Sequence, residues 1–384
     1  MSLEKNIIIH WFRQDLRLCD NPSLFEAAKQ GVVLPIYILD DDNPGLYQMG
    51  GASRWWLYRS LQELNRSLNG NLVIHNGDPK KILLNLVSEN KIKSVFWNRC
   101  YEPWRIRRDK EIKKLLEAQN IKTKSFNGSL LWEPWDALKK DGAPYKVFTP
   151  YYRKGCLNEV SPRKPLGKPR NLNLYVELVN GLPIDNLKLL PTINWHKKLE
   201  PYWRIGETNA QKTFADFKDN CLNNYKKNRN YPALSSVSRL SPHLHFGEIS
   251  PNQIWYDIKI KKETDSINHF LSEIGWREFS HNLLYHFPDL PYNNLQDKFD
   301  RFPWLENEDY LRCWQTGQTG YPLVDAGMRE LWETGYMHNR LRMVVASFLV
   351  KNLLLHWHHG EKWFWDCLLD ADLANNSASW QWVA

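Results

Sequence analysis

The sequence has 384 residues with a formal net charge of +8, and 19 of its residues are tryptophan. This length, with 42% hydrophobic residues, suggests two domains and excludes both global disorder and a mini-protein held by disulfide staples. The longest apolar stretches are too short to span a bilayer, and the N-terminus lacks the pattern of a signal peptide, so no membrane association is expected.

The first third of the chain alternates strand and helix patterns, which predicts a parallel sheet covered by helices on both faces. Apolar runs typical of buried strands lie at Ile7–Phe12, Val32–Leu39, Leu72–His75 and Lys93–Trp97. Helices are expected from Pro22 behind an Asn21 cap, from a Ser53 cap with Leu57, Leu61, Leu64 and Leu68 on one face, and over residues 79–90 and 105–120. Neither common Gly-rich phosphate loop occurs, so a nucleotide-driven motor or a standard dehydrogenase is not supported.

The pattern changes after about residue 135, so we expect an α/β domain over residues 1–135. Residues 136–203 contain many prolines, lysines and asparagines with little periodicity, which predicts a connector over the surface. Residues 204–384 have helical patterns with few strand signals, and the apolar run Leu341–Leu355 predicts a buried helix. The chain is therefore predicted to join an α/β domain to an all-helical one.

The six cysteines are scattered, without the spacing of metal ligands or of a redox pair; they stand at positions 19, 100, 156, 221, 313 and 367. A reducing, cytoplasmic location and no metal site are therefore expected. The positive net charge permits a polyanionic partner but does not prove one.

Tryptophans crowd the helical half, where core packing competes with base stacking or electron transfer as their role. Trp380 and Trp382 follow a polar stretch, residues 370–379, which is costly to bury without a ligand to bond, although a surface turn would also explain it. Glu273, Trp276 and Arg277 share one face of a predicted helix and could clamp a base against a phosphate backbone; the alternative is an ion pair beside a core ring.

Arg340 and Arg342 lie two positions apart and so face different ways on a helix. One could meet phosphate while the other pairs with an internal carboxylate. The alternative is a solvated charged face, which the apolar run directly after them makes less favourable.

Together these clusters resemble the photolyase/cryptochrome family, over nearly the whole chain. The matching segments occur in the family's order and are His10–Arg17, Ser238–Gly247, Trp276–Phe279, Thr319–Asp325, Met337–Met343 and Asp370–Trp382. Within the family the sequence is most similar to class I cyclobutane pyrimidine dimer (CPD) photolyases, which are carbon–carbon lyases. The resemblance implies an α/β domain with a five-stranded parallel sheet, an all-α FAD-binding domain, and UV-damaged DNA as partner of a monomer.

The resemblance also implies a U-shaped FAD inside the helical domain. The residues that match its contacts are Tyr225, Ser238, Leu240, Ser241, Arg277, Asn339, Arg342 with its acid Asp370, Asp372 at the amide edge of the flavin, and Asn376 beside N5. A neutral amide at 376 can accept from a protonated N5 or donate to an unprotonated one, so it tolerates both radical and reduced flavin. Plant cryptochromes carry aspartate there, and a cryptochrome-type light receptor without repair activity is the alternative function.

The family's reaction is light-driven electron transfer from reduced FAD to a thymine dimer that has left the duplex. By resemblance, Trp276 and Trp382 hold the dimer, Glu273 hydrogen-bonds it and Met343 lies against it. Arg229, Arg277 and Arg340 match contacts to the DNA, and Trp304, Trp357 and Trp380 match the chain of rings that passes electrons to oxidised flavin. Glu273, Asn376 and these three tryptophans are thus the expected catalytic residues.

The sequence departs from the family at several places. Val237 stands where relatives often have threonine near the FAD phosphates, and Phe270 replaces a tryptophan of some relatives. Trp104 and Arg105 occupy positions where folate-binding relatives carry an Asn-Glu pair, which leaves the antenna chromophore open: methenyltetrahydrofolate bound differently, a deazaflavin, or none. The family continues for several helices beyond Ala384, so the resemblance implies a helical domain shortened at its C-terminus.

Overall fold

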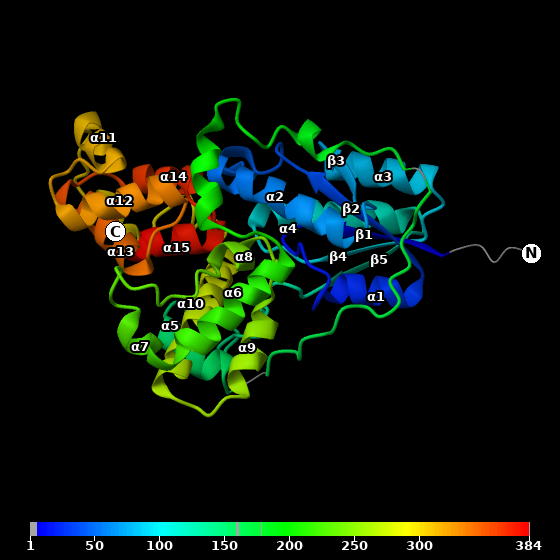
Figure 1. Cartoon of the computed structure of the whole chain (residues 1–384), viewed down its shortest axis with the longest axis horizontal. Coiled ribbons are helices and arrows are strands. Elements are labelled where there is room, and N and C mark those ends of the chain that lie inside the picture. Colours follow the sequence, from blue (N-terminus) through cyan, green and yellow to red (C-terminus); the bar gives the residue numbers. More distant parts are fainter. Residues whose placement is uncertain (1–5, 159–160, 178, 384) are drawn as a thin grey trace, which may run out of the picture.

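A computed structural model describes residues 6–158, 161–177 and 179–383. Figure 1 shows an α/β part, coloured blue to cyan, beside a helical part, coloured green to red. The predicted fold class, an α/β domain followed by a helical one, is confirmed.

The α/β part is built on a parallel sheet that, within the described residues, has five strands in the order β3-β2-β1-β4-β5. The strands are β1 Ile7–Phe12, β2 Val32–Leu39, β3 Val73–Asn76, β4 Ser94–Asn98 and β5 Lys122–Phe126. The helices between and after them are α1 Pro22–Gln30, η1 Gly45–Tyr47, α2 Gly51–Ser67, α3 Pro79–Glu89 and α4 Pro103–Ala118. Buried side chains of α1 and α2 pack on one face of the sheet and those of α3 and α4 on the other.

Two local predictions for this part had different outcomes. Asn21 caps α1 as expected, since its side chain accepts a hydrogen bond from the backbone N–H of Leu24. The prediction that Ser53 caps α2 was wrong, because that helix begins at Gly51 behind Gly50. The Ser53 hydroxyl instead donates to the carbonyl of Leu368, 3.0 Å away in the helical part.

The connecting segment crosses the molecule with short helical turns. These are α5 Phe148–Pro150, the π-helix η2 Tyr151–Cys156, and the 3-10 helices η3 Ile184–Leu187 and η4 Asn194–Tyr202. Figure 1 shows the long irregular stretch between η2 and η4 running along the α/β part. Parallel bridging of Leu174 to Val33 ties this stretch to β2.

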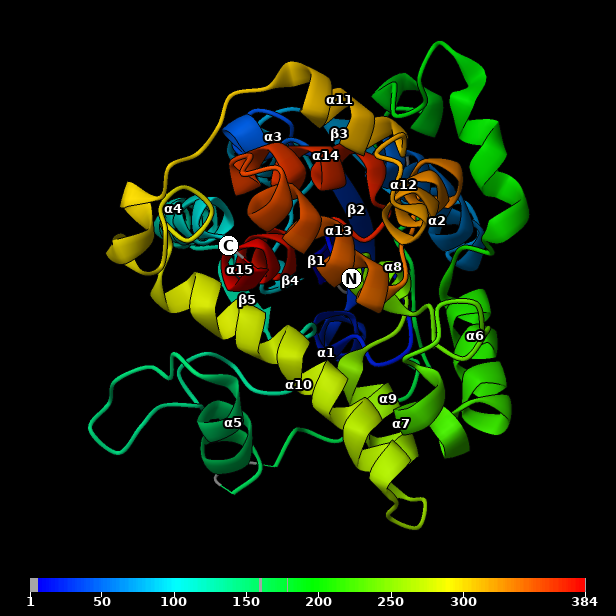
Figure 2. The same cartoon turned by 90° about the vertical axis from the view of Figure 1, so that its left-hand side faces the viewer.

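In the remaining described residues the named elements are all helices, joined by loops. The helices are α6 Glu207–Asn220, η5 Leu222–Asn224, α7 Tyr225–Asn228, α8 Ser241–His245, α9 Pro251–Lys259, α10 Asp265–His286, η6 Asp297–Arg301, α11 Glu308–Thr316, α12 Pro322–Thr334, α13 Asn339–Ser347, η7 Phe348–Asn352, α14 Trp357–Cys367 and α15 Leu373–Val383. Figure 2 shows α10 crossing beneath α15, against which it packs. The buried helix predicted over Leu341–Leu355 is divided: α13 passes into the π-helix η7, and Leu355 pairs with Leu305.

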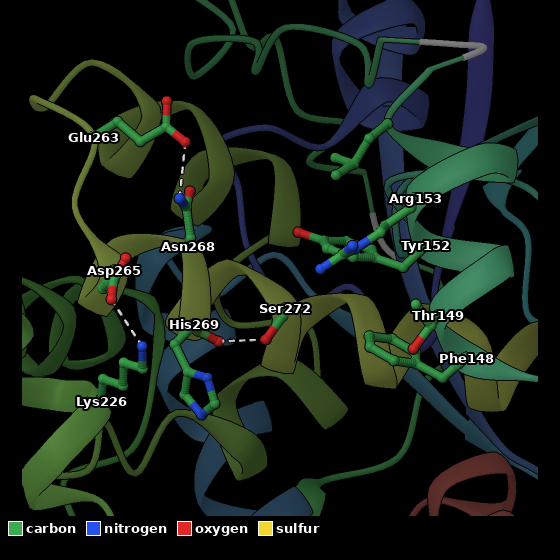
Figure 3. Close-up of a pocket in the computed structure, with 11 residues that line it drawn as sticks. Phe148, Thr149, Tyr152, Arg153, Lys226, Glu263, Asp265, Asn268, His269 and Ser272 are labelled. Atoms are coloured by element: carbon green, nitrogen blue, oxygen red, sulfur yellow. Dashed lines mark hydrogen bonds and ion pairs between the residues drawn. The ribbon is translucent and has the colours of Figure 1, made fainter.

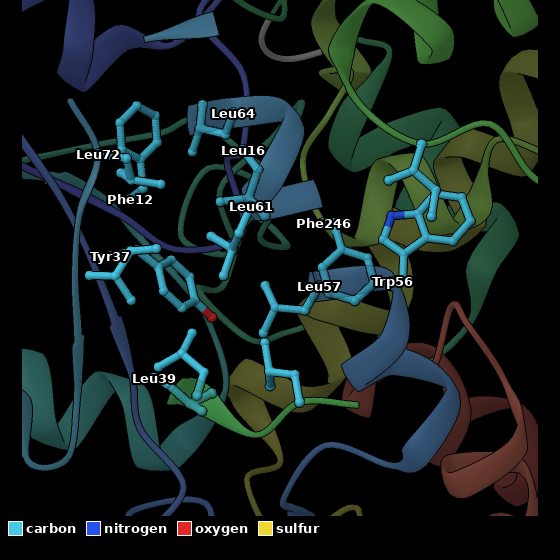
Figure 4. Packing of buried hydrophobic residues seen from close by; sticks show 14 of the residues in the cluster. Phe12, Leu16, Tyr37, Leu39, Trp56, Leu57, Leu61, Leu64, Leu72 and Phe246 are labelled. Atoms are coloured by element: carbon cyan, nitrogen blue, oxygen red, sulfur yellow. The ribbon is translucent and has the colours of Figure 1, made fainter. Parts of the chain in front are cut away.

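The two parts share a continuous apolar core. Leu57, Leu61 and Leu64 of α2 are buried on the face predicted for them, and Figure 4 shows them among residues of the sheet. The same cluster includes Trp56 and Phe246, whose rings stack with centroids 6.2 Å apart, although Phe246 follows α8. The helical part is therefore packed directly against the sheet domain.

None of the helices in the described ranges is long and apolar enough to cross a membrane. Across residues 6–158, 161–177 and 179–383, no group of His, Cys, Asp or Glu side chains is arranged to hold a metal ion. The six cysteines are all free thiols.

Candidate functional site

A polar centre lies where α8, α10 and α15 meet. One carboxylate oxygen of Asp372 accepts from the backbone N–H of Asn375 at 2.8 Å and from its side-chain amide at 2.7 Å. The other lies 3.6 Å from Nε2 of His281 and 3.8 Å from Nδ1 of His245. Burial opposes ionisation of Asp372, but the two histidines and the Asn375 amide outweigh it and hold the pKa of the carboxyl well below its usual range.

Asn376 sits one helical turn beyond Asp372 and is buried. Its side-chain N–H donates to the carbonyl of Glu361 at 3.1 Å, which orients the amide and leaves its oxygen as the group available to a ligand. Glu361 is itself buried and accepts from the Ser377 hydroxyl at 2.7 Å. Burial raises the pKa of Glu361 to about 7.

The predicted pair of Arg342 and Asp370 is formed. One guanidinium nitrogen lies 2.8 and 3.1 Å from the two carboxylate oxygens, and Nε donates to the carbonyl of Met337 at 2.9 Å. Burial alone would lower the pKa of Arg342, but Asp370 outweighs it and the pKa is raised. The positive charge of Arg342 is therefore paired with the carboxylate of Asp370. This agrees with the prediction that one of the two arginines on α13 pairs with an internal carboxylate.

Several buried polar atoms around this centre have no hydrogen-bond partner within the described part of the chain. They are Nε of Arg239, Nδ1 of His245, both amide atoms of Asn282 and Nε2 of His338. Buried polar groups are normally paired, so this set indicates a polar ligand between the loop before α8, α10 and the start of α13. The unpaired groups on the loop before α8, on α8, on α10 and at the start of α13 therefore fit a large polar cofactor such as FAD.

The residues predicted to contact FAD phosphates lie on α7, on the loop that leads into α8 and at the first position of α8. Tyr225 and Leu240 are buried, Ser238 is half-buried and Ser241 is exposed. Between them, Arg239 adopts a left-handed backbone conformation with φ of 51°, which few non-glycine residues tolerate. The loop is thus held in a strained shape, a feature common at ligand-binding segments.

A second group of predicted residues lies on the outer side of α10, α13 and α15. Trp276 is 39% exposed and Trp382 is 64% exposed. Arg229 and Glu273, predicted separately as a phosphate contact and a lesion contact, form a bidentate ion pair in which the second contact is 2.9 Å. Arg229 is almost fully buried, and its guanidinium contacts Glu273 and Nε2 of His269.

The three remaining predicted residues of α13 are Asn339, Arg340 and Met343. The Arg340 guanidinium donates to Oδ1 of Asn230 at 2.8 and 3.0 Å and lies 3.7 Å from the sulfur of Met343. Asn339 is exposed and Met343 is half-buried. Arg340 therefore has an outward environment and Arg342 an inward one, as their spacing on the helix indicates.

Arg277 points to a different place from Glu273 and Trp276. Its guanidinium donates to the carbonyl of Ser129 at 2.8 Å and to Glu278 at 2.9 Å. Glu278, which sequence reasoning did not single out, also accepts from the backbone of Leu131, and burial raises its pKa to about 7. Arg277 thus links α10 to the segment after β5, although helical spacing alone had grouped it with the lesion residues.

The three tryptophans of the predicted electron-transfer chain lie on neighbouring elements. Trp380 and Trp357 are buried and Trp304 is half-buried. Gly360, one turn after Trp357 on α14, lies so close to Trp380 that a Cβ there would be 2.0 Å from its ring. His356 lies between Trp304 and Trp357, with ring centroids 4.9 and 5.6 Å away. Sequence reasoning missed His356, because the short run His356-Trp357-His358-His359 carries no periodic signal.

A separate open pocket of about 470 Å³ lies between the connecting segment and α10 (Figure 3). Phe148 and Tyr152 form one wall, and Lys226 faces Asp265 at 2.8 Å on the other. Its Asn268 donates to Glu263 at 2.8 Å. These polar groups satisfy one another, in contrast to the unpaired atoms around Asp372.

At the antenna positions, Trp104 and Arg105 stack on each other, with the guanidinium carbon 4.8 Å from the ring centroid. Arg105 also lies 3.4 Å from Glu102 and 3.3 Å from the Cys100 sulfur. The side chains that replace the Asn-Glu pair of folate-binding relatives are thus engaged with one another.

The comparisons with known proteins agree with this geometry. A model of the DNA photolyase family matches residues 8–169, and a model of the FAD binding domain of DNA photolyase matches residues 270–384. A deoxyribodipyrimidine photo-lyase of Agrobacterium fabrum is 44% identical over all of this chain and 81% of its own length. Cryptochrome-1 of Arabidopsis thaliana is 36% identical over 98% of this chain and 57% of its own length.

The crystal structure of a bacterial class III photolyase from Agrobacterium tumefaciens superposes with a TM-score of 0.95 at 43% identity, covering all of this chain and 80% of that one. The sequence motifs had suggested class I, whereas this structural relative is of class III. On these matches and the site geometry, the chain belongs to the photolyase/cryptochrome family and carries that family's FAD-binding domain.

Proposed function

We propose that this protein repairs cyclobutane pyrimidine dimers in DNA by light-driven electron transfer, as a deoxyribodipyrimidine photo-lyase. The observation that carries the proposal is the joint placement of two exposed tryptophans, Trp276 and Trp382, on helices that pack around the half-buried Asp372 and the buried Asn376. Exposed rings of this size favour stacking on bases, since every base presents an aromatic face. A dimer held there would be close to a cofactor bound at the unpaired polar atoms.

Within this proposal, Asp372, Asn376, Asn339 and Arg342, with Asp370, hold FAD at the isoalloxazine side. The FAD phosphates are held by Tyr225, Ser238, Leu240 and Ser241. Arg277 supports the site indirectly, because it holds the backbone at Ser129 by a hydrogen bond. The chemistry that FAD supplies when bound is reversible electron donation to the dimer, with the electron returned after the cyclobutane ring has split. Asn376 presents an amide oxygen to the cofactor and so adds no negative charge beside it.

On the DNA side, Trp276, Trp382 and Met343 would enclose the flipped dimer and exclude water. Flipping costs a few kcal/mol, less for a damaged and poorly stacked pair of bases. Glu273, oriented by its ion pair with Arg229, would accept hydrogen bonds from the dimer's N–H groups. Arg340 would contact the DNA backbone, since it is bound only by neutral partners among the described residues.

A blue-light receptor without repair activity is the second candidate, because cryptochromes are among the relatives. It would use the same cofactor site and the rings of Trp304, Trp357 and Trp380. Asn376 is the observation that separates the two proposals, since plant cryptochromes have aspartate at that place. The intact set of Glu273, Trp276 and Trp382 also favours repair.

The test is a repair assay with purified protein whose FAD content has been measured and chemically reduced. Illumination of an oligonucleotide with one dimer should restore the two pyrimidines, and a dark sample should not. Trp382→Ala should lose binding of this DNA, whereas Trp332→Ala, which removes another exposed tryptophan on α12, should keep it. Absence of light-dependent repair at full FAD occupancy would refute the proposal, and failure to bind the dimer-containing DNA as well would favour the receptor instead.

A further inference from the structure

Three aromatic rings form a continuous stack from the connecting segment to the exposed face of α10. Phe148 lies against Trp276 with ring centroids 3.8 Å apart and planes only 10° from parallel. Tyr152, one turn after Phe148, also lies nearly parallel to Phe148, with ring centroids 5.4 Å apart and planes at 11°. Figure 3 shows Phe148 and Tyr152 side by side on this segment. One face of Trp276 is therefore covered by a ring from a segment distant in the sequence.

Contacts from several directions hold this stack in place. Phe279, on the next turn of α10, meets both Phe148 and Trp276 edge-on at 5.9 Å. Gly275 lets Tyr152 approach the helix, because a Cβ at that position would lie 2.6 Å from the Tyr152 ring. Trp132 contacts Tyr152 at 6.4 Å. Phe148 is thus partly buried and packed against the core of the helical part, and it is not a loose cover over Trp276.

An indole has two faces, and Phe148 uses one of them. The exposed 39% of Trp276 is what remains for a base. A ring backed by a parallel neighbour is confined to one plane and is already shielded from water on its far side, so stacking a base on it loses less side-chain freedom. Without Phe148 behind it, the indole of Trp276 would have to become ordered when the base binds.

We propose that Phe148 is a positioning residue for dimer recognition: it fixes the plane of Trp276 so that the free face of the indole is presented to the flipped pyrimidine dimer. This inference rests on the proposed function and extends it to a residue outside the helical half. Phe148 acts through Trp276 and does not touch the dimer. An opposite role, in which Phe148 occupies the place of the base and must swing away, predicts the opposite effect on binding.

The test compares Phe148→Leu, which removes the ring, with Phe148→Tyr, which keeps it. A matched control is Phe126→Leu on β5, which removes the same atoms from a ring that contacts Phe96 at 6.1 Å in the sheet domain. For each protein, the dissociation constant is measured for one oligonucleotide with and without a single dimer, together with thermal unfolding and FAD content. Repair per bound dimer is measured at saturating DNA.

Phe148→Leu should weaken binding of dimer-containing DNA by about 3- to 10-fold, the scale of one aromatic pair, with dimer-free DNA unaffected. Repair per bound dimer at saturation should stay unchanged, and Phe148→Tyr should behave like the wild-type protein. Unchanged discrimination in Phe148→Leu, tighter binding, or an equal loss in Phe126→Leu would overturn the inference. Lack of discrimination in the wild-type protein would instead refute the proposed function.

Discussion

The close approach of Gly360 to Trp380 allows one perturbation to be worked out from the structure. An alanine Cβ at 360 would lie 2.0 Å from one ring carbon of Trp380 and 2.6 Å from two others. Carbon atoms in contact prefer separations of about 3.5 to 4 Å, so the indole would have to move away by about 1.5 Å. Gly360→Ala should therefore displace one of the three rings of the proposed electron-transfer chain.

The expected energies oppose each other. Overpacking of this kind costs about 1–3 kcal/mol, whereas alanine in place of glycine within a helix gains up to about 1 kcal/mol. A net loss of about 1 to 2 kcal/mol in the free energy of unfolding should result, measurable by urea denaturation. Photoreduction of oxidised flavin should slow although the protein stays folded, because the rate of electron transfer depends on the position of the Trp380 ring.

Gly167→Ala is the control, since no atom lies within 4 Å of a Cβ built there. It should leave both the free energy of unfolding and photoreduction unchanged. Repair by chemically reduced Gly360→Ala protein should also be kept. Wild-type photoreduction and stability in Gly360→Ala would show that the packing argument is wrong.

Three further predictions concern buried groups. Trp380→Phe should block photoreduction of oxidised flavin but spare repair by chemically reduced protein; repair lost under both conditions would mean that the ring is structural. Glu361 has its pKa raised to about 7 from an ordinary 4.5, so ionisation favours the unfolded chain and its cost grows as the pH rises from about 4.5 to 7. Glu361→Gln should flatten that part of the stability profile measured by denaturation at each pH, and an unchanged slope would refute the assignment. Arg342→Met leaves Asp370 buried without its cation and should cost about 3–5 kcal/mol of stability, whereas Arg312→Met, in an exposed pair, should cost well under 1 kcal/mol. Similar losses in the two variants would contradict the burial argument.

The elements that sequence patterns located correctly are those whose own residues decide their structure. The strands β1 and β2 have the predicted bounds, because continuous apolar runs suit a sheet covered on both faces. The prediction for Ser53 was wrong because its hydroxyl is used by Leu368, more than three hundred residues away, and a local capping rule cannot include that partner. The π-helix η7 likewise lies inside an apolar run that reads as one uninterrupted helix.

Some contacts of the candidate site could likewise be predicted from the sequence, and others could not. The resemblance to the family paired Arg342 with Asp370 correctly, since each lies in one of the segments that carry the resemblance. Helical spacing places Arg277 beside Glu273 and Trp276, but it cannot show that the guanidinium turns toward the carbonyl of Ser129. That direction depends on a contact with a segment distant in the sequence. Phe148 was missed because its contact with Trp276 joins an irregular segment to a helix with no sequence signal in common.

The guanidinium of Arg17, almost fully buried between the sheet and the helical part, has a consequence for how the protein unfolds. It donates to the carbonyls of Asp20, Gly128 and Gly247 at 2.6 to 2.8 Å. Pulling the two parts of the molecule away from each other would strip a cation of these acceptors and expose the apolar core that they share. We therefore expect the protein to lose both parts in one cooperative transition, with no stable half-folded state in which the sheet domain survives alone.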